Sequence, residues 1–177
     1  MSVLFVHGSS NFKSRTTSVI SHFKNTYTNN GIKTQLVTPA DIPANELIHY
    51  QFQSNSIIQF QNAVSDSEII VISTPIYQSS FAGTLKLLLD LIPQKGLSNK
   101  IIIPVATGGS IAHLLAIEYA LNPVLSNMGA ETILPGIYGT NQDFIDQQTH
   151  YEIQNISLTQ RIEQTVQRSL AYFPAFA

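Results

Sequence analysis

The sequence predicts a doubly wound α/β domain, in which helices cover both faces of a mostly parallel sheet. Three observations predict this class. Short runs rich in valine and isoleucine recur along the chain, these runs alternate with amphipathic helical periods, and the 177 residues show no change of composition that would mark a second domain. We therefore expect a single domain over residues 1–177, long enough to bury a sizeable core.

Five short apolar runs are the candidate strands. They are mostly apolar on both faces, which is typical of parallel strands that lie between two layers of helices. The runs cover residues 3–6, 35–37, 69–72, 101–105 and 132–134.

Apolar side chains between these runs recur with the spacing of one helical face. The stretch 42–60 lacks a clear period, and we expect it to be a surface excursion with one short helix at its end. The three helical stripes are Val19, Ile20, Phe23 and Tyr27; Leu85, Leu88, Leu89 and Ile92; and Leu158, Ile162, Val166 and Leu170.

Composition excludes several classes of function. Nine basic and eleven acidic residues give a net charge of -2, too balanced for nucleic acid or an anionic membrane as the main partner, so a small ligand is expected. With no cysteine and five scattered histidines, the chain offers no disulfide, no catalytic thiol and no predicted metal site. The sequence shows no signal peptide and no apolar run of membrane-spanning length, which predicts a cytoplasmic protein.

The first predicted loop, GSSNFKSRTTS from Gly8 to Ser18, is rich in hydrogen-bond donors and contains no carboxylate. A helix start presents free N–H groups and a partial positive charge, so this loop predicts an anion site, and capping of a solvated turn is the alternative. Neither G-x-x-x-x-G-K-[ST] nor G-x-G-x-x-G occurs here, which favours a single phosphate over a pyrophosphate. The candidate contacts are Ser9, Asn11, Ser14, Arg15, Thr16 and Thr17.

The second predicted loop, STPIYQSSFAG from Ser73 to Gly83, carries two aromatic rings among small residues. Pro75 fixes the backbone directly after a buried strand and removes one donor. Tyr77 and Phe81 are expected to offer a wall for a flat ligand, or to pack on the core or on a partner subunit, and for Phe81 the subunit contact is an equal alternative.

The third predicted loop, ATGGSIAH from Ala106 to His113, contains the pair Gly108 and Gly109, where backbone can approach a ligand closely. Thr107 and Ser110 add hydroxyl groups. The three loops follow strands one, three and four of the flavodoxin-like order 2-1-3-4-5, and strands one and three flank the point at which FMN binds in that fold.

Pro123 lies inside an otherwise helical run that begins near Gly109. It cannot donate to the carbonyl of Tyr119, and its ring crowds that carbonyl, so the helix must kink or widen into a π-bulge.

With these motifs assembled, the chain resembles the NADPH-dependent FMN reductases of the flavodoxin-like superfamily, especially the reductases of two-component alkanesulfonate monooxygenase systems. The resemblance rests on GSSNFKSRTTS, on STPIYQSSFAGTLKLLLDLIP from Ser73 to Pro93, and on PVATGGSIAHLLAIEYALNPVL from Pro104 to Leu125. It implies a three-layer sandwich around a five-stranded parallel sheet.

The resemblance also implies roles for individual residues. The first loop would hold the FMN phosphate through Ser9, Ser14, Arg15, Thr16 and Thr17. Asn11 stands where the family often has arginine, so that either the phosphate affinity would be lower or Lys13 and Arg15 would carry the charge instead. Tyr119 matches the residue that marks a π-helix at a tetramer interface. The ribityl chain and ring would be lined by Thr74, Pro75, Ile76 and Tyr77, and the isoalloxazine edge by Thr107, Gly108, Gly109 and Ser110.

The implied activity is hydride transfer from NADPH, or NADH, to FMN, with delivery of reduced flavin to a partner monooxygenase of sulfonate or sulfur assimilation. The flavin carries the redox chemistry, so no catalytic side chain is expected. An FMN-bound quinone or azo reductase and a flavodoxin-like electron carrier are the alternatives, although carriers are strongly acidic and this chain is nearly neutral. A homodimer or homotetramer with Phe81 and Tyr119 near its interfaces is expected.

Overall fold

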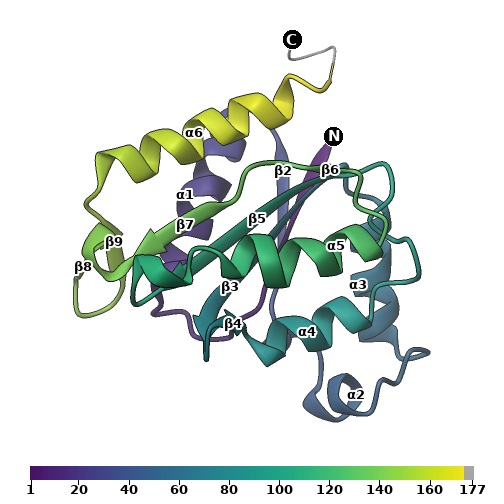
Figure 1. Cartoon of the computed structure of the whole chain (residues 1–177). Helices are drawn as coiled ribbons and strands as arrows, with labels where there is room; N and C mark the ends of the chain where they lie inside the picture. Colours follow the sequence, from purple (N-terminus) through teal and green to yellow (C-terminus); the bar gives the residue numbers. More distant parts are fainter. Residues whose placement is uncertain (174–177) are drawn as a thin grey trace.

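The computed structural model of the protein, which describes residues 1–173, is built around a parallel sheet of order β2-β1-β3-β5-β6 (Figure 1). This order confirms the predicted 2-1-3-4-5 arrangement, with β5 and β6 in the places of the fourth and fifth strands. The strands are β1 (Ser2–His7), β2 (Lys33–Val37), β3 (Ile69–Tyr77), β5 (Ile101–Gly108) and β6 (Thr132–Ile133).

The fifth strand is split in two, where the sequence predicts one run over 132–134. The short β6 and the following β7 (Ile137–Thr140) both pair with β5, one after the other. Pro135 lies between them and has no N–H to donate to a ladder, so the strand is interrupted there.

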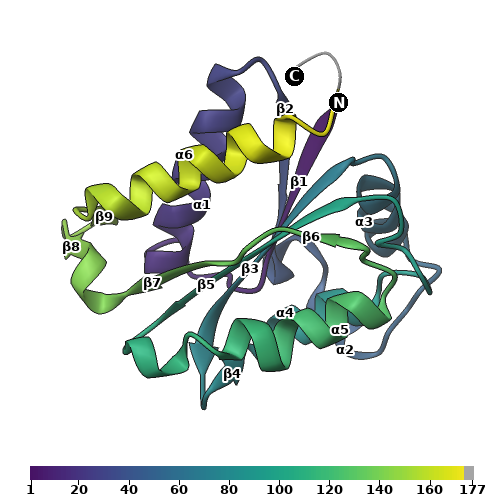
Figure 2. The same cartoon turned by 45° about the horizontal axis from the view of Figure 1, so that its top comes forward.

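Helices cover both faces of the sheet, as predicted (Figure 2). Leu4 and Val6 of β1 pack in the same cluster as the helices of one layer, and Val3 and Phe5 in that of the other, because neighbouring side chains of a strand point to opposite faces. One layer consists of α1 (Arg15–Asn29) and α6 (Ile156–Leu170), and the other of α3 (Asn55–Ser65), α4 (Gly83–Asp90) and α5 (Asn122–Asn127).

The three predicted helical stripes are buried in α1, α4 and α6. Ile92 is buried as well, but it lies beyond the end of α4 at Asp90. The helix stops shortly before Pro93, which disfavours helical backbone at the residue preceding it.

The expectation for residues 42–60 is wrong in part. This stretch contains α2 (Ala44–Ile48) and the start of α3, which continues to Ser65. Leu47, Ile57 and Phe60 are buried in the core between the sheet and these helices. The apolar side chains in 42–60 therefore belong to two short core-facing helices rather than to a surface excursion.

Two of the predicted loops are shorter than expected, because the strands before them continue. Residues Ser73 to Pro75 still pair with Val105 to Thr107, so β3 ends only at Tyr77 and β5 only at Gly108. Beyond the sheet, β3 forms a hairpin with β4 (Ser80–Phe81) through a turn in which Gln78 and Ser79 have φ of 48° and 64°. Two such residues are typical of a tight hairpin turn.

The strain inferred at Pro123 takes the form of a π-helix. The segment η3 (Ile117–Leu121) is a π-helix that contains Tyr119, and the N–H of Asn122 donates to the carbonyl of Ile117, five residues earlier. Pro123 follows directly in α5 after helical backbone at Leu121 and Asn122, so the π-helical turn before it accommodates the missing N–H and the bulk of the ring. The structure thus decides between the two predicted outcomes in favour of the π-helix.

The chain between β7 and α6 forms a small hairpin of β8 (Phe144–Asp146) and β9 (Tyr151–Ile153). It lies beside the N-terminal part of α1, beyond the carboxyl edge of the sheet (Figure 1). Among residues 1–173, no helix has the length and apolar character needed to cross a membrane.

Candidate functional site

The carboxyl ends of β1, β3 and β5 surround a cavity of about 350 Å³, which we call the central cavity. Most of the residues that the sequence singles out line it, although they come from three separate segments. Its lining consists of Asn11, Lys13, Ser14, Arg15, Thr16, Pro75, Ile76, Tyr77, Thr107, Gly108, Gly109, Asn141 and Tyr151.

One end of the central cavity is the N-terminus of α1. Ser14 is the N-cap, and its hydroxyl accepts a hydrogen bond from the N–H of Thr17 at 3.1 Å. The N–H groups of Arg15 and Thr16, like those of any first helical turn, have no acceptor within the helix. The first turn contains no acidic residue, so the positive end of the helix dipole faces the cavity without compensation.

The guanidinium of Arg15 adds a fixed positive charge to this end. It lies over the ring of Tyr151, 4.7 Å from the ring centre. Its Nε is buried and has no hydrogen-bond partner among the described residues. A buried donor without an acceptor is costly, so the residues of this end fit an anionic group such as a phosphate.

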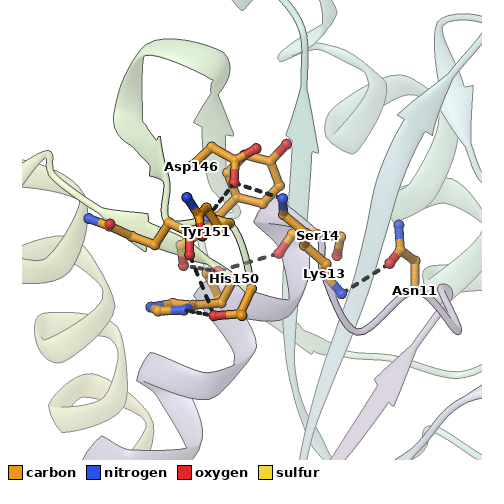
Figure 3. A network of polar contacts seen from close by, with 10 residues as sticks. Asn11, Lys13, Ser14, Asp146, His150 and Tyr151 are labelled. Carbon is orange, nitrogen blue, oxygen red and sulfur yellow. Dashed lines mark hydrogen bonds and ion pairs between the residues drawn. The ribbon is translucent and has the colours of Figure 1, made fainter.

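The β8–β9 hairpin holds the first loop in place (Figure 3). Lys13 Nζ forms an ion pair with Asp146 at 2.8 Å and lies 5.7 Å from the centre of the Tyr151 ring. The hydroxyl of Ser18 donates to the backbone carbonyl of Tyr151 at 2.5 Å. Asp146 neutralises the charge of Lys13, which leaves Arg15 as the uncompensated cation at this end.

Sequence reasoning missed Asn141, Asp146 and Tyr151. All three follow β7, the second half of the fifth strand, and therefore lie at the same carboxyl edge as the three loops that were considered. The rule that ligands bind beyond the carboxyl ends of parallel strands applies to this loop too, so the signal was present in the polar run after residue 139.

The other end of the central cavity is formed by β3 and β5. The ring of Tyr77 is 63% exposed on the β3–β4 hairpin, next to Pro75 and Ile76. Across the cavity, a side chain on Gly109 would meet no atom nearer than 3.9 Å, so this position is open. Phe81, by contrast, is half-buried against the core.

Gly108 lines the central cavity and also has a packing role that the sequence does not predict. A Cβ on Gly108 would lie 2.1 Å from the hydroxyl of Tyr138, and that hydroxyl donates to the carbonyl of Ser110 at 2.8 Å. The missing side chain therefore makes room for a buried tyrosine, which in turn shapes the loop of Gly109 and Ser110.

Four predicted residues do not line the central cavity. Ser9 and Thr17 are engaged within the first loop, where Ser9 accepts from the N–H of Asn11, and Thr17 donates to the carbonyl of Asn11. Thr74 is fully buried and accepts from the N–H of Ala82 at 2.9 Å, which fixes the hairpin. Ser110 caps the short helix η2 (Ile111–His113) and lines a neighbouring cavity.

Two of the lining threonines have hydroxyls that contact each other. Thr16 is fully buried, and its Oγ1 lies 2.5 Å from Oγ1 of Thr107. This contact ties the start of α1 to the end of β5. It leaves the backbone N–H of Thr16, rather than its hydroxyl, as the group available to a ligand.

The buried side chain of His7 connects β3 to the start of α1. Its Nδ1 lies 2.9 Å from the Ser73 hydroxyl, and its Nε2 lies 3.2 Å from the Thr17 hydroxyl. Burial disfavours the charged imidazolium and lowers the pKa of His7 from 6.5 to about 4.

Stability should therefore fall as pH decreases from 7 to 5. The unfolded chain binds a proton at His7 below about pH 6.5, whereas the folded chain does not until about pH 4, so the loss over this window is about 2 kcal/mol. Urea unfolding at both pH values measures it. The variant His7→Gln removes the titrating group, and an equally steep pH dependence in that variant would contradict the assignment.

These features define a class of protein. Three groups meet at the switch point of the 2-1-3-4-5 sheet. They are the cationic end at the first loop, the exposed ring of Tyr77 at the end of β3, and the open position of Gly109 after β5. Such a site fits a flavin mononucleotide, with its phosphate at α1 and its ring between Tyr77 and Gly109, in a flavodoxin-like protein.

Comparison with known proteins identifies the family. The model of the family described as NADPH-dependent FMN reductase matches residues 1–144, so the chain belongs to this family and is an oxidoreductase that uses a nicotinamide nucleotide and FMN. An FMN reductase (NADPH) of Pseudomonas putida is 37% identical over 98% of this chain and 86% of its own length. An FMN reductase (NADPH) of Escherichia coli is 33% identical over 82% of this chain and 76% of its own length.

Solved structures agree on the fold. The apo form of an NADH:FMN oxidoreductase, EMOB, aligns with a TM-score of 0.83 and 24% identity over 99% of this chain and 92% of that one. An oxidoreductase from Corynebacterium diphtheriae aligns with a TM-score of 0.74 and 20% identity over 93% of this chain and 92% of that one. At these identities the likeness shows the flavodoxin-like fold.

Proposed function

We propose that this FMN reductase uses FMN as an exchangeable substrate and supplies reduced flavin to a partner monooxygenase of sulfonate or sulfur assimilation. When bound, FMN would accept a hydride at N5 from C4 of the reduced nicotinamide. The chain's own residues would bind and orient the two ligands, so no side chain is assigned a catalytic role. The predicted single domain over residues 1–177 and the predicted cytoplasmic location belong to the same proposal.

The observation that carries the proposal is the charge balance of the first loop. Arg15 offers a buried donor without a partner, whereas Lys13 is already paired with Asp146 at 2.8 Å. A phosphate would therefore meet one uncompensated side-chain cation and two helical N–H groups. We infer an affinity high enough for turnover and low enough for the flavin to leave.

The assignment of individual residues to FMN is part of this proposal. Arg15 and the N–H groups of Arg15 and Thr16 would hold the phosphate, with Ser14 and Asn11 beside it. The ring would lie between Tyr77 and Gly109. Four predicted residues would act indirectly, because their hydrogen bonds fix the loops that make these contacts. They are Ser9, Thr17, Thr74 and Ser110.

An oligomer is also proposed. Tyr119 lies on the π-helix η3 and is 79% exposed, and Ile111 and Leu115 in the segment before η3 are also exposed. This apolar surface supports a homodimer or homotetramer that buries Tyr119, and Phe81 lies on the nearby hairpin.

Steady-state oxidation of NADPH and NADH with free FMN, FAD or a quinone in excess tests the proposed function. We expect turnover with free FMN, and gel filtration should separate FMN from the protein. Turnover with a quinone but not with free flavin, or flavin that stays bound through gel filtration, would favour the alternative of an FMN-bound quinone or azo reductase.

A further inference from the structure

All three arginines of the chain line cavities. Arg15 lines the central cavity, and Arg161 and Arg168 of α6 line two further cavities. The guanidinium group is the side chain best matched to phosphate oxygens, since it donates two parallel hydrogen bonds in a fork. The chain has only nine basic residues, so the placement of all three arginines at cavities suggests that these cavities bind an anion.

The three cavities adjoin one another through shared residues. Gly109 lines both the central cavity and a second cavity of about 500 Å³, which also contacts Tyr138 and Arg161. Arg161 in turn lines a third cavity of about 310 Å³ together with Thr165 and Arg168. We call the second and third cavities together the α6 groove. It leads from the flavin edge at Gly109 along α6 beside β7.

The charges of the α6 groove suit an anion. Within residues 1–173, neither Arg161 nor Arg168 forms an ion pair, and Arg161 Nη2 donates only to the Tyr138 carbonyl, at 3.3 Å. Asp143 also lines the second cavity, and the charge of Arg161 helps to lower the pKa of its carboxyl group, so part of the charge of Arg161 is compensated. The carboxylate oxygens accept from the N–H of Thr140 at 2.6 Å and from the side-chain amide of Asn155 at 2.5 Å, and they form no hydrogen bond with Arg161. The two guanidinium groups therefore keep donors available for a ligand.

The spacing of the two arginines matches a ligand with two separate phosphate positions. Seven residues along a helix correspond to two turns, so Arg161 and Arg168 lie on one face about 10 Å apart. NADPH carries a pyrophosphate in its middle and a further phosphate on the 2′-oxygen of the adenosine ribose. Its nicotinamide must reach the flavin ring, which places the rest of the molecule beyond Gly109.

We propose that the α6 groove binds the adenosine half of NADPH, with Arg161 at the pyrophosphate and Arg168 at the 2′-phosphate. This inference rests on the proposed function for the direction in which the dinucleotide lies. It makes Arg168 the residue that favours NADPH over NADH. The sequence alone shows no basic cluster for a 2′-phosphate, because the two arginines lie on the C-terminal helix, far along the chain from the three loops.

Calorimetric binding of adenosine 2′,5′-bisphosphate and of 5′-AMP to the flavin-free protein tests the site without turnover. We expect the bisphosphate to bind more tightly than 5′-AMP. The substitution Arg168→Gln should weaken the bisphosphate about tenfold, since one charge-assisted interaction is lost, and leave 5′-AMP nearly unchanged. A bisphosphate that does not bind the wild-type protein, or a loss shared equally by both ligands, would overturn the proposal.

Kinetics with free FMN supply the second measurement. Arg168→Gln should raise KM for NADPH about tenfold and leave KM for NADH unchanged, whereas Arg161→Gln should raise both. Lys33→Gln removes one charge from β2, at the opposite edge of the sheet, and should change neither. Unchanged NADPH selectivity in Arg168→Gln would refute the groove, whereas a wild-type protein that oxidises no nicotinamide would refute the proposed function instead.

Discussion

The substitution Arg15→Ala is expected to weaken FMN binding about 10- to 100-fold, because a charge-assisted hydrogen bond to a phosphate contributes about 1.5–3 kcal/mol. The buried Nε of Arg15 has no partner among the described residues, and in the proposed site the phosphate would be its acceptor. Alanine is a good helix former at the first position of α1, so the fold should tolerate the change. Quenching of flavin fluorescence measures the affinity.

Two comparisons separate a phosphate contact from a general effect. Riboflavin has the same ring without the phosphate, and its binding should change little in Arg15→Ala. Lys24→Ala removes an exposed positive charge further along α1 and should leave FMN binding intact. Equal losses for FMN and riboflavin in Arg15→Ala would contradict the phosphate assignment.

The substitution Gly8→Ala is expected to lower the free energy of unfolding by about 2–3 kcal/mol, in the upper part of the usual range of about 1–3 kcal/mol for overpacking a filled core. A Cβ on Gly8 would lie 2.5 Å from Cβ of Leu85 and 3.1 Å from its Cα, and these atoms cannot swing away as the end of a long side chain can. Gly8 is also held on both sides. Its N–H donates to the carbonyl of Ser73 at 2.7 Å, and its carbonyl accepts from the hydroxyl of Thr84 at 2.6 Å. Urea denaturation gives the difference in stability.

Gly83→Ala is the matched control for this prediction. Gly83 begins α4, two residues before Leu85, but a Cβ there would meet no atom within 4 Å. This variant should be as stable as the wild-type protein or slightly more so, because alanine favours the helix. If both variants lost the same stability, the contact of Gly8 with α4 would not be the cause.

The first loop was predictable because its physical requirements are local. A donor-rich segment that ends at a helix N-cap needs no distant residue, and Ser14 and Arg15 lie where the sequence places them. The strand ends were harder to predict. Ser73 to Pro75 look like loop residues in isolation, and they are strand residues because β5 continues beside them.

The rest of the candidate site depends on contacts between segments far apart in the chain. Tyr151 is more than 130 residues from Ser18, whose hydroxyl donates to its carbonyl, and its ring lies beside both Lys13 and Arg15. Gly108 must lack a side chain because the hydroxyl of Tyr138 occupies that space. No periodicity or short motif reports pairs of this kind.

The class of fold, the order of the sheet, the helix start after the first loop and the family could be predicted from the sequence, because hydrophobic periods and short loop motifs are read within a few neighbouring residues. The tertiary structure was needed to show which of the loop residues face the cavity, that Asp146 neutralises Lys13 while Arg15 Nε has no partner among the described residues, and that Arg161 and Arg168 line neighbouring cavities beside α6. Charge balance and cavity shape depend on residues that are far apart in the chain and come into contact only after folding.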